Sequence, residues 1–91
     1  MRDKRFEWDD RKADTNLRDH KVSFALARLV FDDPNALDEV DDEPDEERWA
    51  RIGLAQGLFL YVVYTDRGHR IRIISARRAE RHEQDRYYQQ R

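Results

Sequence analysis

Eight consecutive apolar, aromatic or β-branched residues, Leu58–Thr65, constrain the fold of this chain more than any other feature. Such a run suits a central strand whose two faces are both covered. Asp66-Arg67-Gly68 follows it as a tight-turn signal, and Arg70–Ala76 then alternates between Arg and Ile side chains. Arg48–Leu54, which precedes the run, also alternates with period two, and Gln56-Gly57 marks the turn between them. The sequence therefore predicts an antiparallel meander of three strands.

Helical segments are predicted before this meander. Phe6-Glu7-Trp8 indicates a short strand or extended segment, after which Asp9 or Asp10 can cap a helix over residues 10–20. Ser23 is a favourable N-cap for a second helix over residues 24–32, which ends because the residue before Pro34 is pushed out of the helical region.

The remaining segments complete the predicted architecture. Residues 35–47 contain few apolar groups, and Pro44 argues against a central strand, so a loop or a ragged edge strand is expected there. A final helix is predicted over residues 77–89. The fold class is therefore α+β, with helices on one face of a small antiparallel sheet. A length of 91 residues indicates one domain, residues 1–91.

Composition excludes several classes of protein. The chain contains no cysteine, which excludes a disulfide scaffold, a thiol nucleophile and a thiolate metal site. Its longest apolar run, Leu58–Tyr64, is far shorter than the roughly 18 residues of a membrane-spanning helix. The N-terminus, Met-Arg-Asp-Lys-Arg-Phe-Glu-Trp, lacks the apolar core of a secretory signal. We therefore expect a cytoplasmic protein without a membrane partner.

Charge is distributed unevenly along the chain, although the formal net charge is only −2. Residues 32–47 contain ten Asp or Glu and no Lys or Arg, whereas residues 67–91 contain eight Arg against three Asp or Glu. One interpretation is a solvated acidic loop and a solvated helix. The other is an anion-binding surface plus an acidic segment that shields it or faces a basic partner. The excess of Arg over Lys favours nucleic acid, because Arg binds phosphate bidentately, although GC-rich codon usage produces the same excess.

The clearest indication of a binding site lies after residue 69. If Ser75 or Ala76 is the N-cap of the last helix, Arg77 and Arg78 fall in its first turn, where they oppose the helix dipole. Free backbone N–H groups, Arg side chains and a Ser hydroxyl together indicate a phosphate site. The candidate phosphate-binding residues of this stretch are Arg70, Arg72, Ser75, Arg77 and Arg78.

Two considerations weigh on this site. The alternative is that Arg77 and Arg78 form ion pairs with nearby carboxylates such as Glu80, or with the acidic segment. In a regular strand Arg72 and Ser75 lie on opposite faces, so both can serve one site only if the strand bends or ends near Ile74.

A polar face of the first predicted helix is the second candidate site. Lys12, Asn16 and His20 recur at intervals of four and share this face. Histidine changes charge near neutral pH, so His20 can act as a general acid or base with Lys12 beside it. The alternative is a solvent-facing polar stripe. His69 and His82 are expected to be solvated, and no metal-ligand spacing is evident.

Aromatic and acidic residues supply further candidates. Trp8 and one of Tyr87 and Tyr88 can stack on a base. Glu83 lies one turn before Tyr87, and it is an ordinary surface partner unless the helix packs over the Arg cluster. No Gly-rich phosphate loop or nucleophile elbow is present, so no cofactor or metal is expected. What remains is metal-independent chemistry on a phosphodiester, or binding without turnover.

Several strings in the chain resemble the BrnT family, the toxins of bacterial type II toxin–antitoxin systems. They cover about residues 6–88, and they are Phe6-Glu7-Trp8-Asp9, the spaced Lys12, Asn16 and His20, Val22-Ser23-Phe24, and Arg70–Ala79 with Glu83 and Tyr87. Ala25-Leu26 replaces the acidic pair usual in the family, and the acidic segment 38–47 is richer in Asp and Glu than expected.

The resemblance implies a RelE-like α+β fold and an RNA-cleaving toxin that inhibits translation. It also implies a cognate BrnA-type antitoxin, whose ribbon-helix-helix domain binds the operon DNA, so that DNA is contacted only through the antitoxin. The complex implied is a heterotetramer with two copies of each chain.

Metal-independent RNA cleavage requires a base or oriented donor, cations that stabilise the phosphorane, and an acid for the leaving oxygen. The roles we assign as hypotheses are phosphate stabilisation by Arg72, Arg77 and Arg78, positioning by Ser75, acid–base chemistry by His20 or Lys12 with Glu83 or Tyr87 as alternatives, and base stacking by Trp8. The competing function is a non-enzymatic module that binds nucleic acid or a partner, such as a degraded toxin retained for its antitoxin complex.

Overall fold

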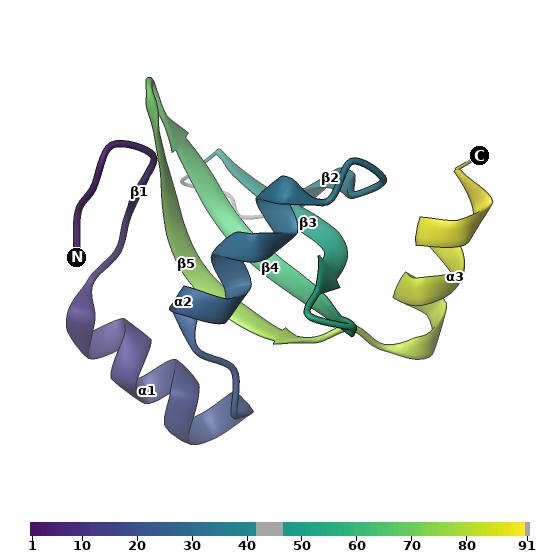
Figure 1. The fold of residues 1–91 in the computed structure, drawn as a ribbon, viewed down its shortest axis with the longest axis horizontal. Helices are drawn as coiled ribbons and strands as arrows, with labels where there is room; N and C mark the ends of the chain where they lie inside the picture. Colours follow the sequence, from purple (N-terminus) through teal and green to yellow (C-terminus); the bar gives the residue numbers. More distant parts are fainter. Residues whose placement is uncertain (42–46, 91) are drawn as a thin grey trace.

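The computed structural model describes residues 1–41 and 47–90 and confirms an α+β fold. The elements in chain order are β1 (Phe6–Glu7), α1 (Asp10–His20), α2 (Phe24–Ala27), the 3₁₀ helix η1 (Arg28–Asp32), β2 (Leu37–Asp41), β3 (Arg48–Ala55), β4 (Leu58–Arg67), β5 (Arg70–Arg78) and α3 (Arg81–Gln89). The strands form one sheet in the order β1-β5-β4-β3-β2 (Figure 1). The sheet is mixed rather than purely antiparallel, because β1 pairs parallel to β5.

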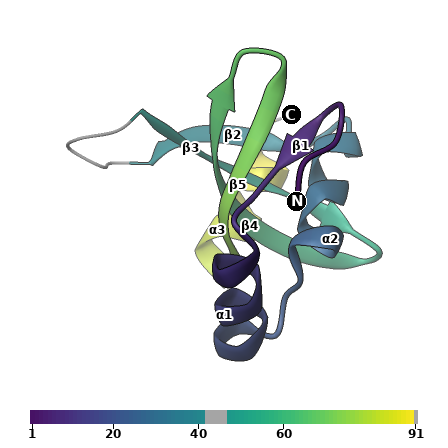
Figure 2. The ribbon, with the colours of Figure 1, turned by 90° about the vertical axis from the view of Figure 1, so that its left-hand side faces the viewer.

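The predicted meander is confirmed as β3, β4 and β5, which pair antiparallel. Gln56 and Gly57 form the first turn with φ of 50° and 82°. The second turn is Gly68-His69, one residue later than expected, because Arg67 still pairs with Arg70. Two-residue turns with positive φ match the right-handed twist of the strands that they join. Figure 2 shows this twist, with the β4–β5 hairpin and the β2–β3 strands extending in different directions.

The N-terminal helices begin at the predicted capping residues. The Asp9 carboxylate accepts a hydrogen bond from the backbone N–H of Lys12, and the Ser23 hydroxyl accepts one from that of Leu26. Lys21 ends α1 in the left-handed conformation with φ of 60°. The second predicted helix covers the expected residues, but it changes from α to 3₁₀ geometry at the start of η1.

The two faces of the sheet are covered by different helices. Leu60 and Val62 of β4 belong to the main core with Phe24 of α2 and Val30 of η1. Alternate residues point to the other face, where the Phe59 ring lies edge-on against Tyr87 of α3 at 5.2 Å between centroids. The expectation that all helices cover one face is therefore wrong for α3.

The last helix begins four residues later than predicted. Pairing of β5 with β4 continues to Arg78, and the backbone N–H of Ala79 still donates to the carbonyl of Phe59 at 2.9 Å. Glu80 is the N-cap, and it forms a capping box with Glu83. The N-terminus of α3 is thus closed by carboxylates, and the predicted phosphate site built on helical Arg77 and Arg78 does not form.

The acidic segment is only partly described, since residues 42–46 lie outside the described ranges. Its first part forms the edge strand β2. The Asp38 carboxylate accepts two hydrogen bonds from Arg51, both of 2.8 Å, and one from the Tyr64 hydroxyl. Glu39 pairs in the same bidentate way with Arg86. These two carboxylates pair with Arg side chains other than the predicted phosphate-binding ones.

Candidate functional site

A β-bulge in β5 places predicted phosphate-binding residues on one face of the sheet. Val63 pairs with Ser75 and Thr65 pairs with Arg72, and the register shifts directly after Val63. The shift accommodates one extra residue in β5, Ile74. Val63 and Thr65 share a face of β4, so Arg72 and Ser75 share that face as well. The strand is therefore irregular near Ile74, which was the condition for Arg72 and Ser75 to serve one site.

Arg77 extends this row of residues. It pairs with Tyr61, which shares the face of Val63, and its guanidinium carbon lies 4.1 Å from the centre of the Tyr61 ring. Arg72, Ser75 and Arg77 therefore line the face of β5 that points away from α2. We call these three residues the β5 row.

Helix α1 lies along the outer edge of β5, where Asn16 fixes its position. The buried Asn16 amide donates to the Ala76 carbonyl at 2.8 Å and accepts from the Ala76 N–H at 3.1 Å. It also donates to the Val22 carbonyl at 2.9 Å. The side chain satisfies the backbone of Ala76 as a neighbouring strand would. Asn16 is therefore a structural residue rather than part of an exposed polar face.

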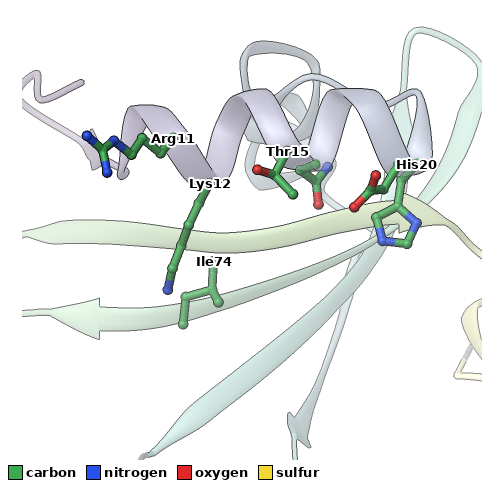
Figure 3. A pocket seen from close by; sticks show the side chains of 7 residues that line it. Arg11, Lys12, Thr15, His20 and Ile74 are labelled. Carbon is green, nitrogen blue, oxygen red and sulfur yellow. The ribbon is translucent and has the colours of Figure 1, made fainter.

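A shallow groove of about 280 Å³ lies between α1 and β5. Its lining residues are Arg11, Lys12, Thr15, Asn16, Asp19, His20 and Ile74. Figure 3 shows Lys12 and His20 leaving α1 toward β5 at opposite ends of this groove. We call it the α1–β5 groove.

The spacing of helix and strand sets which residues face each other across the groove. Four residues advance about 6 Å along a helix, and two residues advance about 6.6 Å along a strand. Because Asn16 contacts Ala76, Lys12 lies level with the bulge residue Ile74, which lines the groove with it. One turn in the other direction brings His20 toward the end of β5 that carries Arg77.

Lys12 and His20 are both exposed to solvent. Within residues 1–41 and 47–90, neither side chain forms a hydrogen bond or an ion pair, so both can reach a ligand without breaking one.

The two Arg residues of the β5 row are held by carboxylates. Arg72 donates to Glu7 of β1 at 2.8 Å. Arg77 donates to both oxygens of Glu83, at 2.8 and 2.7 Å, and to the carbonyl of Arg78 at 3.2 Å. The alternative prediction, that Arg77 forms an ion pair with a nearby carboxylate, is thus correct. A guanidinium has five N–H donors, so donors remain on each Arg to bind a phosphate.

Glu83 is almost completely buried, with 3% of its surface exposed. Burial raises the pKa of its carboxyl, but hydrogen bonds from Arg77 and from the Glu80 N–H outweigh burial and hold the pKa below its usual range. A buried, ionised carboxylate with three hydrogen bonds is suited to hold Arg77 in place rather than to transfer a proton to substrate.

This ion pair predicts a pH dependence of stability. The pKa of folded Glu83 is lowered, so its contribution is present at neutral pH and is lost as the pH falls below the usual range of a glutamate, about 4 to 5. Glu83→Gln is expected to lower the free energy of unfolding by about 1–3 kcal/mol at pH 7, with a smaller difference at pH 3. Urea unfolding at both pH values measures this, with Asp85→Asn as an exposed control on the same helix. Equal losses at both pH values would contradict it.

The structure places several predicted site residues away from the groove. Trp8 packs edge-on against Phe24, at 5.7 Å between ring centres, on the other side of α1. Tyr87 is buried, and its hydroxyl donates to Asp33 at 2.9 Å. Arg70 follows the alternation of Arg72, but its Nε donates to the Asp3 carbonyl. Arg78 pairs with Leu60 and follows that residue's face.

Sequence reasoning missed other residues of the site. Arg11, Thr15 and Asp19 line the groove, and their spacing of four residues beside the Lys12 stripe is the signal that could have identified them. Tyr61, which supports Arg77, carries no sequence signal, because its contact depends on strand register.

No group of three His, Asp or Glu side chains within the described ranges is arranged to hold a metal ion. None of the described helices has the length and apolar character needed to cross a membrane.

Comparison with known protein families shows which family the chain belongs to. The family described as a ribonuclease toxin, BrnT, of type II toxin–antitoxin systems matches residues 8–83. The chain belongs to the BrnT family. A search of curated proteins returned no match. The match includes α1, the whole sheet from β2 to β5, and Glu83, so the α1–β5 groove and the β5 row lie inside the BrnT region.

BrnT membership gives the general activity of the chain. The chain is a toxin of a type II toxin–antitoxin system with ribonuclease activity. RNA is therefore its substrate class, and an antitoxin is its partner. The resemblance predicted from the sequence strings is confirmed.

Proposed function

We propose that this BrnT toxin is a metal-independent endoribonuclease that inhibits translation, with its active site in the α1–β5 groove and the β5 row. The observation that supports the proposal is the β-bulge at Ile74, which puts Arg72, Ser75 and Arg77 on one face of the sheet. Ile74 itself lines the groove that Lys12 and His20 also line. Apart from Ile74, these are cationic and hydroxyl groups, which suit a phosphodiester.

The chemistry follows from these groups. One of His20 and Lys12 takes the proton from the ribose 2′-hydroxyl, whose oxygen attacks phosphorus, and a protonated group donates a proton to the departing 5′-oxygen. Arg72 and Arg77 stabilise the negative charge that develops on the phosphorane, and Ser75 positions the phosphate. The products are a 2′,3′-cyclic phosphate and a 5′-hydroxyl. In this scheme cationic side chains supply the charge stabilisation that a metal ion supplies in other nucleases.

Glu83 supports this scheme as a positioning residue because it holds Arg77. Trp8, Arg70 and Arg78 remain candidates for contacts with a longer RNA outside the groove. Tyr87 would need to break its bond to Asp33 before it could take part.

The partner proposed is a BrnA-type ribbon-helix-helix antitoxin, in a heterotetramer with two copies of each chain. DNA is contacted only through that antitoxin. We also propose that residues 1–91 form one RelE-like domain that acts in the cytoplasm.

A second function is a non-enzymatic module that binds RNA or the antitoxin without turnover. The carboxylate pairs of Arg72 and Arg77 favour it to some degree, because they reduce the positive charge available at the β5 row.

Expression of the chain from a tightly repressed promoter separates these functions. The toxin is expected to stop growth, halt incorporation of labelled amino acids and degrade cellular RNA, and co-expression of the antitoxin is expected to restore all three. Unimpaired growth with intact RNA, at a protein level verified by blotting, would contradict the proposed function and favour the binding module.

A further inference from the structure

We propose that the antitoxin docks in a second groove, between α1 and α2, by inserting an apolar side chain flanked by a Lys or Arg. This inference rests on the antitoxin partner of the proposed function and adds the surface that receives it. The groove has a volume of about 340 Å³ and lies on the side of α1 opposite the α1–β5 groove. We call it the α1–α2 groove, and the lining residues that matter are Trp8, Asp10, Ala13, Asp14, Leu17 and Phe24.

The walls of this groove are apolar. Ala13 and Leu17 recur at an interval of four on one stripe of α1, and Leu17 is 48% exposed. Across from them, Trp8 packs edge-on against Phe24 of α2. A half-exposed leucine beside aromatic side chains leaves apolar surface in water, and protein interfaces commonly use such surface as their core.

The rim of the groove is acidic, so the segment that docks there is expected to carry positive charge. Asp10 precedes Ala13 by three residues and Asp14 precedes Leu17 by three residues, so both carboxylates border the apolar stripe. The Asp10 side chain is 81% exposed, and its carboxylate lies 3.1 Å from the Met1 amino group. Within the described residues, Asp14 forms no ion pair. An apolar centre with carboxylates at its rim fits an amphipathic segment that carries Lys or Arg beside its apolar anchor.

Val40, another exposed apolar residue, provides a contrast to Leu17. Val40 is 68% exposed, but it lies on the edge strand β2 and does not line this groove. Val40 therefore supplies a matched control for substitutions at Leu17.

The position of the groove separates antitoxin binding from RNA cleavage. Lys12, Asn16 and His20 occupy one side of α1, whereas Ala13 and Leu17 occupy the other. Substitutions at Leu17 or Asp14 are thus expected to weaken the antitoxin complex and to leave RNA cleavage unchanged.

The test measures antitoxin affinity by titration calorimetry and RNA cleavage on the same preparations. Leu17→Lys is expected to raise the Kd for the purified antitoxin about 30-fold or more, the effect of a central interface residue. Asp14→Lys is expected to have a similar effect because it sets a like charge against the Lys or Arg of the partner. The cleavage rate of both variants is expected to stay within about twofold of wild type. Val40→Lys is expected to change neither quantity. Thermal unfolding verifies that the variants fold, and Leu17→Ser is a milder second variant with the same expected direction.

A Kd within threefold of wild type for both Leu17→Lys and Asp14→Lys would overturn the docking surface. Loss of RNA cleavage together with antitoxin binding, in a folded variant, would overturn the separation of the two faces. An antitoxin that fails to bind wild-type protein would refute the partner itself, whatever the variants do.

Discussion

Substitution of His20 or Lys12 by Ala is expected to slow RNA cleavage by about 10²–10⁴-fold, the usual effect of removing an acid or base from the reacting centre. Both side chains project into the α1–β5 groove from positions that Asn16 fixes against β5. Both are exposed, so the fold is expected to tolerate their removal. The loss should therefore appear in the single-turnover cleavage rate and not in the unfolding temperature.

The control for these variants is Arg18→Ala, which removes a cation from α1 outside the groove. It is expected to cleave RNA at the wild-type rate. If His20→Ala and Lys12→Ala both retain a rate within threefold of wild type, the groove is not the site of acid–base chemistry.

Removal of positive charge from the β5 row is expected to have the second large effect. A combined Arg72→Gln, Arg77→Gln and Glu83→Gln variant should lose at least about 10³-fold in cleavage rate, since removal of one transition-state donor typically costs about 10²–10³-fold. The Glu83 substitution is included because removal of Arg77 alone would leave a buried carboxylate without its ion pair. The variant thus tests charge at the site without leaving the buried Glu83 carboxylate unpaired.

RNA affinity gives an independent measurement of the same residues. Removing one Arg–phosphate interaction should reduce the slope of log K against log salt concentration by about 0.7 for a single strand. The control is Arg81→Gln, whose side chain is 90% exposed at the start of α3. An unchanged rate and an unchanged salt slope in the combined variant would show that the β5 row does not bind phosphate.

The sheet could be predicted from the sequence because its signals are local. The period-two alternation and the Gly-containing turns give the meander, and Asp9 and Ser23 cap the helices that they were expected to cap. β1 was expected as a short strand or extended segment, but without a pairing partner. Its parallel pairing with β5 depends on contacts between residues about 65 positions apart, such as Glu7 with Arg72.

The start of α3 could not be placed because pairing across the sheet overrides local preference. Arg77 and Arg78 can join a helix in isolation, but their backbone groups complete the ladder with β4. Helix propensities differ by less than about 1 kcal/mol per residue for ordinary side chains, and this pairing decides the outcome. The carboxylates expected near a helix N-terminus are present one turn later, as Glu80 and Glu83.

The residue types of the candidate site could be predicted from the sequence, but their arrangement in space could be predicted only in part. Lys12, His20, Arg72, Ser75 and Arg77 were all identified by their spacing or type. That Arg72 and Ser75 share a face depends on a single extra residue in β5. The alternation of the strand showed that an irregularity near Ile74 was needed for a shared site, but no sequence signal showed that one forms there. The burial of Glu83 and Tyr87 depends on α3 packing on the face opposite α2.

The most direct test of the proposed active site is cleavage of a defined single-stranded RNA by the purified protein in excess EDTA, with analysis of the product ends. The proposal predicts cleavage that gives 2′,3′-cyclic phosphate and 5′-hydroxyl ends, and no cleavage where the attacking ribose is replaced by 2′-deoxyribose. The combined variant, prepared in the same way, controls for contaminating nucleases. Intact RNA in EDTA that is cleaved after addition of Mg²⁺, or 5′-phosphate product ends, would contradict the proposal.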